Sequence, residues 1–248
     1  FTAFFMIQIP DYLFPLIFIA ALLYASVGHG GASGYLALMG IIGVNLQDAK
    51  PVALILNCIV AIIAFIQFHR GGYFNRRLFI MLAIASVPCA YLGGMITIED
   101  HLYKRILGVV LLVSSFRFLL PSQEEKETNR PSDASLLATG SGIGFLSGLI
   151  GIGGGIILTP LLLLMRWSKI KEAACVSALF IFVNSMSGLT AQIQKGIRWQ
   201  PDMFMMITFA TLGGLIGSYY GAKKWNTPVL KILLSVVLMI ASFKLILI

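Results

Sequence analysis

Two stretches of this chain decide its fold: ASVGHGGASGYLALMG at residues 25–40 and GFLSGLIGIGGGIILTPLLLLM at residues 144–165. Each places a cluster of glycines inside an otherwise apolar segment. In membrane transporters built from internal repeats, Gly- or Pro-interrupted hydrophobic segments at corresponding positions of the two halves mark the binding site. The pair therefore predicts a repeat protein whose functional site lies where the two glycine clusters meet.

The composition excludes an ordinary soluble domain. Hydrophobic residues make up 58% of the 248 residues and charged residues only 11%, against about 25% charged residues in a typical soluble domain. A complete helical crossing of a bilayer needs about 20 residues. We expect an all-α polytopic membrane protein, placed in the bacterial inner membrane if its source is prokaryotic, with apolar segments at residues 12–27, 32–44, 51–68, 78–97, 102–120, 135–150, 152–165, 173–193, 203–222 and 229–248.

The chain repeats itself across its middle. The glycines of residues 28–31 fall on those of residues 151–154 at an offset of 123 residues, and the last segments, YKRILGVVLLVSSFRFLL and LKILLSVVLMIASFKLIL, align at an offset of 127. Between the halves, the polar run SQEEKETNRPSD predicts a solvated linker. We divide the chain into a first membrane repeat at residues 1–120, a cytoplasmic linker at 121–134 and a second membrane repeat at 135–248.

Each half holds about five hydrophobic segments, and an odd number predicts that the second half enters the membrane from the opposite side, as an inverted repeat. The interrupted segments at the start of each half, residues 12–44 and 135–165, either cross fully or re-enter. If residues 12–44 re-enter, the first half loses two crossings and its number stays odd. Lys and Arg favour cytoplasmic loops, and their distribution puts both termini outside. The net charge of +8 is scattered over short loops, which argues against a nucleic-acid partner.

The glycine clusters have the chemistry of an anion site. Unwound backbone at membrane depth is tolerated only where it is buried in protein or lines a polar cavity, and free N–H groups at a helix start bind anions without a formal charge. Nearby hydroxyl and amide side chains would assist. The predicted substrate-binding set is Gly28, His29, Gly30, Gly31, Ser33, Gly151, Gly153, Gly154, Gly155, Thr159, Asn57, Asn184 and Ser185.

His29 is the ionisable side chain predicted near the midplane. It could exchange a proton with the substrate pathway, or it could be a neutral histidine bonded to a carbonyl. No Asp or Glu lies inside an apolar segment, so proton coupling through His29 is one of several open mechanisms. For any single glycine, close helix packing is the alternative role, and we predict that role for Gly140, Gly144 and Gly148.

The two glycine stretches resemble the paired signatures of the TauE/SafE sulfite exporter family, and the similarity covers nearly the whole chain. The GxGGG cluster followed by Thr159-Pro160 is the more specific of the two. The first stretch departs from the family's commoner pattern, with His29 in the turn and Tyr35-Leu36-Ala37 in place of a second Thr-Pro pair. The resemblance implies a multi-pass permease for sulfite or a small organosulfonate, with export as the expected direction. The inverted repeat permits alternating access, by rocking of one half against the other around the site.

Three other classes of protein are weighed against this interpretation. An anion channel or a non-transporting membrane protein would also use helix N-termini and glycines. The GASG sequence at residues 31–34 matches the GxSG pattern of rhomboid proteases, with Ser33 as nucleophile, but no suitably placed downstream histidine accompanies it, so we expect no enzyme.

Cys58, Cys89 and Cys175 lie singly in apolar segments, which predicts neither a disulfide nor a metal site, and no cofactor is expected. The oligomeric state stays open.

Overall fold

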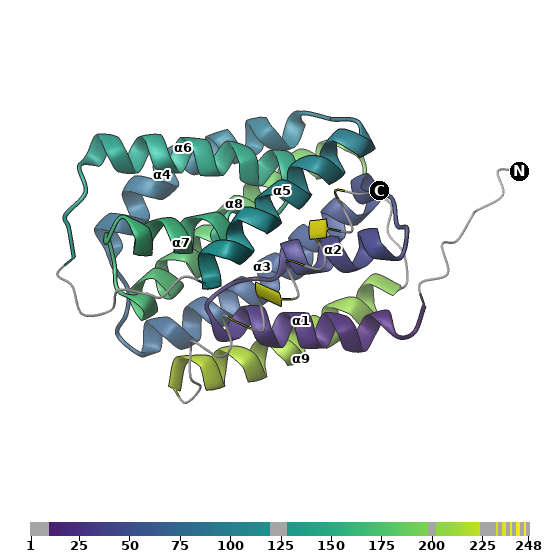
Figure 1. The fold of residues 1–248 in the computed structure, drawn as a ribbon, viewed down its shortest axis with the longest axis horizontal. Helices are drawn as coiled ribbons and strands as arrows, with labels where there is room; N and C mark the ends of the chain where they lie inside the picture. The colour runs from purple at the N-terminus through teal and green to yellow at the C-terminus, as the bar shows by residue number, and fades with distance from the viewer. Residues whose placement is uncertain are drawn as a thin grey trace, which may run out of the picture.

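The structure is a computed structural model that describes residues 10–119, 128–197 and 202–223, with seven single positions between 232 and 246. Over these residues the chain forms helices and no strand (Figure 1). The helices are α1 (Leu13–Ser26), α2 (Ala32–Ile41), α3 (Leu46–Arg70), α4 (Arg76–Met95), α5 (Asp100–Leu119), α6 (Asp133–Ile150), α7 (Gly155–Leu164), α8 (Ile170–Lys195) and α9 (Asp202–Lys223).

The all-helical, multi-pass prediction is confirmed. By length and composition, five of the described helices, α3, α4, α6, α8 and α9, can cross a membrane, whereas α1, α2 and α7 are shorter apolar helices of 14, 10 and 10 residues. Helix α6 begins at Asp133, two residues inside the predicted linker. The predicted last segment, residues 229–248, falls mostly outside the described residues.

Helices α3 and α8 form the centre of the bundle and run antiparallel. Asn57 near the middle of α3 bonds Ser185 of α8, and Phe68 near the end of α3 packs with Ala174 and Cys175 near the start of α8. Their apolar spans are 56% and 61% buried, against 33–39% for the other three crossing helices. These two helices correspond in the predicted repeat, so their opposite directions agree with an inverted relation, which itself stays a prediction.

Glycines bring two helix pairs into backbone contact. A Cβ added at Gly140, Gly144 or Gly148 of α6 would overlap a backbone carbonyl of α4, and the partners advance together along both helices, so α4 and α6 run parallel. The packing role predicted for these three glycines is confirmed. Helices α1 and α9 pack in the same parallel way, through overlaps of Gly213, Gly217 and Gly221 with the carbonyls of Phe18, Leu22 and Ser26.

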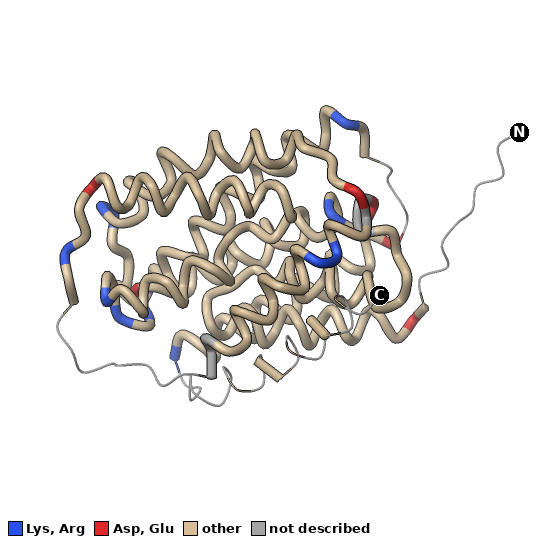
Figure 2. The backbone as a smooth tube through the Cα atoms, turned by 45° about the horizontal axis from the view of Figure 1, so that its top comes forward, with Lys and Arg blue, Asp and Glu red and all other residues tan. Residues whose placement is uncertain are grey.

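Charged residues of the described chain gather at the two ends of the bundle (Figure 2). At one end, Arg77 pairs with Asp133, and the Asn75 side-chain amide donates to Glu172 at 2.6 Å. These contacts join the first turn of α4 to the start of α6, and the N-cap of α4 to the start of α8. The basic residues Arg76, Lys169 and Lys171 also lie together at this end of the bundle, whereas the side of the membrane that this end faces stays a prediction.

Candidate functional site

Both predicted glycine turns are turns in the structure, and each separates a longer helix from a ten-residue one. Gly31 is the N-cap of α2 with φ 99°, and Gly154 is the N-cap of α7 with φ 79°. Residues with a Cβ atom rarely adopt this left-handed backbone conformation, because the Cβ lies too close to the carbonyl oxygen. The backbone conformation therefore requires glycine at both caps. The turns share a positive φ at Gly28 and Gly151 and at the two caps, but Gly153 also has a positive φ and its counterpart Gly30 does not.

The two turns meet inside the bundle through His29. The His29 ring is 2% exposed, and its Nε2 lies 3.0 Å from the carbonyl oxygen of Gly155 in the other turn. Its Nδ1 lies 3.1 Å from the Val27 carbonyl oxygen. A neutral imidazole has one N–H donor and an imidazolium has two. Both contacts are therefore hydrogen bonds only when the ring is protonated.

Asn57 of α3 ties the turns to the central helices. Its Oδ1 accepts from the N–H of Ala32 in the first turn of α2, at 3.0 Å. Its Nδ2 donates to Ser185 Oγ at 2.7 Å and lies 3.4 Å from the Ile152 carbonyl oxygen in the second turn. The side chain is 1% exposed. Asn57 thus bonds to both predicted half-sites and to α8 at once.

The glycines beside Asn57 make room for its amide. A Cβ added at Gly30 would overlap Asn57 Oδ1, and one added at Gly153 would overlap Asn57 Nδ2. Either substitution would push the amide away from the turns. The amide can lie between the two turns only because both positions are glycine.

Backbone donors of the turns remain open. Within the described part of the chain, the N–H groups of Gly30, Gly31, Gly153 and Gly154 have no hydrogen-bond acceptor. A buried N–H without a partner costs about 1–3 kcal/mol. Four such groups on two adjacent turns form a donor set that an anion would satisfy.

The other predicted polar residues, Ser33, Thr159 and Asn184, bond to side chains outside the two turns. Ser33 donates to Tyr24 Oη at 2.9 Å, so its hydroxyl pairs with α1 and not with the histidine that the protease alternative would require. Thr159 donates to Ser177 Oγ at 2.7 Å. The Asn184 amide donates to Ser86 Oγ at 3.0 Å, which places it between α8 and α4. Of the predicted polar side chains, His29, Asn57 and Ser185 form the group that joins the turns.

Lys50 belongs to this region although it lies just outside the apolar segment predicted at residues 51–68. It lies in α3 at 5% exposure, and its ammonium donates to the Leu149 carbonyl at 2.8 Å. The Tyr103 hydroxyl donates to the neighbouring Ile150 carbonyl. A cation and a hydroxyl thus bond the end of α6, where the helix leaves carbonyls without internal partners. The position of Lys50 in the sequence, beside a predicted loop, does not indicate that its side chain is buried.

A small internal cavity of about 20 Å³ lies beside the turns. Its lining includes His29 and Thr159, one from each half. This volume holds about one water molecule, which is less than sulfite with its four heavy atoms needs. The turns in this structure are therefore closed on one another.

No described group of three His, Cys, Asp or Glu residues could hold a metal ion, and Cys58, Cys89 and Cys175 are free thiols. The described chain is a bundle of apolar helices in which two interrupted hairpins meet away from both charged ends. This is the architecture of a multi-pass membrane transporter.

Comparison with known proteins identifies the family. The sequence pattern described as Sulfite exporter TauE/SafE matches residues 13–245, and the chain belongs to this family. The "Probable membrane transporter protein y4hK" of Sinorhizobium fredii is 32% identical over 233 residues, which cover 92% of this chain and 94% of the relative. The "Probable membrane transporter protein YunE" of Bacillus subtilis is 23% identical over 230 residues, 81% and 82% of the two chains. No solved structure matches significantly.

Proposed function

We propose that the protein exports sulfite or a small organosulfonate, bound between the two glycine turns. The family name supports the substrate class. The observation that carries the site is the set of four unpaired N–H groups on adjacent turns, Gly30, Gly31, Gly153 and Gly154. In the apolar interior of the bundle these dipoles act at low dielectric, where they attract a desolvated anion more strongly than in water.

The neighbouring side chains complement this donor set. Protonated His29 brings a positive charge to the junction of the turns, and Ser185 and Thr159 bring hydroxyl donors that can rotate toward an anion. Sulfite offers three oxygen acceptors in a pyramid, so donors converging from two turns can each engage one. The transporter would bind by hydrogen bonding, with one titratable charge and no metal.

Alternating access would separate the turns. The His29–Gly155 and Asn57–Ile152 contacts join the two halves in the closed arrangement described here. Rocking of one half against the other would exchange these contacts for contacts to the anion, as transporters with inverted repeats allow. The anion would then accept hydrogen bonds from the four N–H groups of the two turns while the carrier changes between its two open forms.

Radiolabelled sulfite uptake into proteoliposomes tests the proposal. Anaerobic buffer prevents oxidation of sulfite to sulfate during the assay. We expect saturable uptake that unlabelled sulfite or methanesulfonate inhibits and that equimolar sulfate inhibits less. Sulfate is a dianion throughout the assay and costs more to desolvate than the monoanions hydrogen sulfite and methanesulfonate. Absence of sulfite and methanesulfonate flux with folded, monodisperse protein would contradict the proposal.

The pH dependence of transport in the same proteoliposomes tests the role of His29, and a dye inside the vesicles reports the internal pH. His29→Gln retains one N–H donor for the Gly155 carbonyl but cannot change its charge. Methanesulfonate is the substrate of this assay, because it keeps a single charge over the pH range in which sulfite itself exchanges a proton. We expect the wild-type flux to change with pH as His29 gains or loses its proton, and the variant flux to lose this dependence. A variant that retains the wild-type pH profile would remove His29 from the mechanism.

A further inference from the structure

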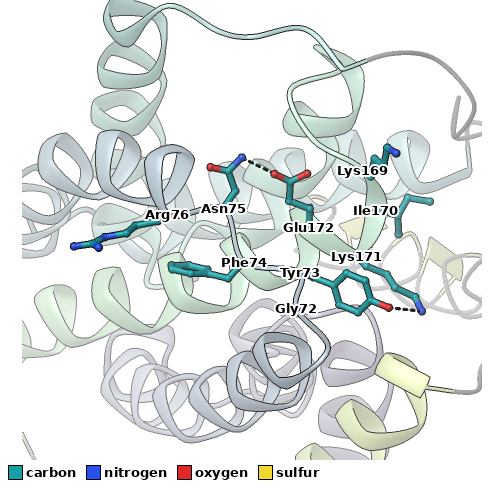
Figure 3. A pocket seen from close by; sticks show the side chains of 9 residues that line it. All are labelled: Gly72, Tyr73, Phe74, Asn75, Arg76, Lys169, Ile170, Lys171 and Glu172. Carbon is teal, nitrogen blue, oxygen red and sulfur yellow. Dashed lines mark hydrogen bonds between the residues drawn. The ribbon is translucent and has the colours of Figure 1, made fainter.

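A second, larger cavity of about 760 Å³ opens at the end of the bundle where the α3–α4 and α7–α8 loops meet. Figure 3 shows its lining, which comes from two segments far apart in the sequence, residues 72–76 and residues 169–172. None of these residues belongs to the predicted binding set. The cavity is large enough for a hydrated small anion.

The charges around this cavity favour anions. Arg76, Lys169 and Lys171 are exposed on its rim, and Glu172 is the one carboxylate of the lining. The Asn75 amide donates to that carboxylate at 2.6 Å, which offsets part of its negative charge. Helices α4 and α8 also begin here, and helix N-termini add partial positive charge.

The cavity continues toward the glycine turns. Ile170 and Lys171 line both this cavity and the small internal one that reaches His29 and Thr159. Two residues on the first turn of α8 therefore form the partition between the exposed end of the bundle and the junction of the two turns. The two cavities are therefore neighbours at the start of α8.

Lys171 is held at the partition by weak contacts. Its ammonium lies 3.4 Å from Tyr73 Oη, 3.4 Å from the Ala222 carbonyl oxygen and 5.1 Å from the centre of the Tyr73 ring. Figure 3 shows the Lys171 side chain beside Tyr73, with its ammonium next to the Tyr73 hydroxyl. Long contacts of this kind are readily exchanged for a shorter bond to an oxyanion.

We propose that the large cavity is a mouth of the transport pathway, and that Lys171 binds the oxyanion there and admits it to the inner cavity beside His29. The inference rests on the proposed function and assigns a second, transient binding site to it. The ligand is a small free oxyanion, recognised by one exposed ammonium and the positive field of the rim.

Lys171→Met tests this site by transport kinetics, with Lys171→Arg and Lys223→Met as controls. Lys223 is a neighbouring cation that stacks on Tyr219 at 4.4 Å and lines neither cavity. We expect Lys171→Met to raise the KM for sulfite about 5- to 10-fold with little change in the maximal rate, because local charge sets the local anion concentration. Lys171→Arg and Lys223→Met should keep the wild-type KM. An unchanged KM in Lys171→Met, or an equal rise in Lys223→Met, would overturn the proposal.

A labelling experiment reads the same site without sulfite transport. Ile170→Cys is labelled with a sulfonated maleimide and with neutral N-ethylmaleimide, over the background of the native cysteines. We expect the ratio of anionic to neutral labelling rates to fall about fivefold when Lys171→Met is added, and to stay constant with Lys223→Met. A fall in the ratio without any sulfite flux would uphold the anion mouth and reject sulfite as substrate. An unchanged ratio would reject the mouth whatever the flux.

Discussion

Asn57→Leu is expected to lower sulfite flux at least about 100-fold, the largest loss of transport at any one side chain of the site. Leucine has a similar volume but leaves the Ala32 N–H and Ser185 without the amide, and it removes a contact to Ile152. Each buried polar group that loses its partner costs about 1–3 kcal/mol. The two turns would then lose the connection that sets their spacing.

Two further variants separate the bonds of this amide. Ser185→Ala removes one hydrogen bond and should reduce flux by about tenfold or less, since a single neutral bond contributes about 1 kcal/mol. Asn57→Asp keeps the acceptor for Ala32 but loses the donor and adds a negative charge, so it should abolish anion flux while α2 stays capped. Uptake assays on samples matched for size-exclusion profile give the comparison. Wild-type flux in Asn57→Leu would show that the anion does not pass between these turns.

Gly148→Ala is expected to cost at least about 3 kcal/mol of stability, the largest effect of a single added methyl group in the bundle. The new Cβ would overlap the Ala90 carbonyl oxygen, which belongs to the backbone of α4 and cannot rotate away. Overpacking typically costs about 1–3 kcal/mol where flexible side chains can yield, and a backbone contact yields less. The parallel pair α4 and α6 would have to separate.

Gly142→Ala is the matched control on the same helix. Nothing lies within 4 Å of a Cβ at Gly142, and alanine has the higher helix propensity in water-soluble hosts. We expect Gly142→Ala to keep the wild-type melting temperature in detergent, whereas Gly148→Ala lowers it or yields no monodisperse protein. Gly221→Ala should repeat the loss in the other pair, since its Cβ would overlap the Ser26 carbonyl. Equal melting temperatures for Gly142→Ala and Gly148→Ala would contradict the packing described here.

The turns themselves could be predicted from the sequence because their cause is local. Clustered glycines interrupt apolar segments too short to cross a bilayer, and the structure places the N-caps Gly31 and Gly154 at those interruptions. The membrane-crossing helices could be predicted in the same way, from the length of uninterrupted apolar sequence. The pairing of Asn57 with Ser185 lies beyond such reasoning, although both were predicted as site residues, because it depends on how α3 crosses α8.

The different burial of Lys50 and Lys171 could not be predicted from the sequence. Lys50 and Lys171 both stand near the start of a helix, beside loop residues. Lys50 is buried because the Leu149 carbonyl, 99 residues away, accepts from it, whereas Lys171 stays exposed on a cavity wall. Asn184 likewise bonds Ser86 of α4, a partner that no local pattern indicates. Partners distant in the sequence decide these three environments.

Counterflow of sulfite tests the central claim most directly, because it separates a carrier from a channel. Proteoliposomes loaded with unlabelled sulfite are diluted into a trace of labelled sulfite without oxygen. A carrier whose site between the turns faces each side of the membrane alternately predicts transient accumulation of label above its external concentration, and loss of that accumulation in Asn57→Leu. Label that only equilibrates would indicate a channel, and absence of label uptake with folded protein would contradict sulfite as the substrate.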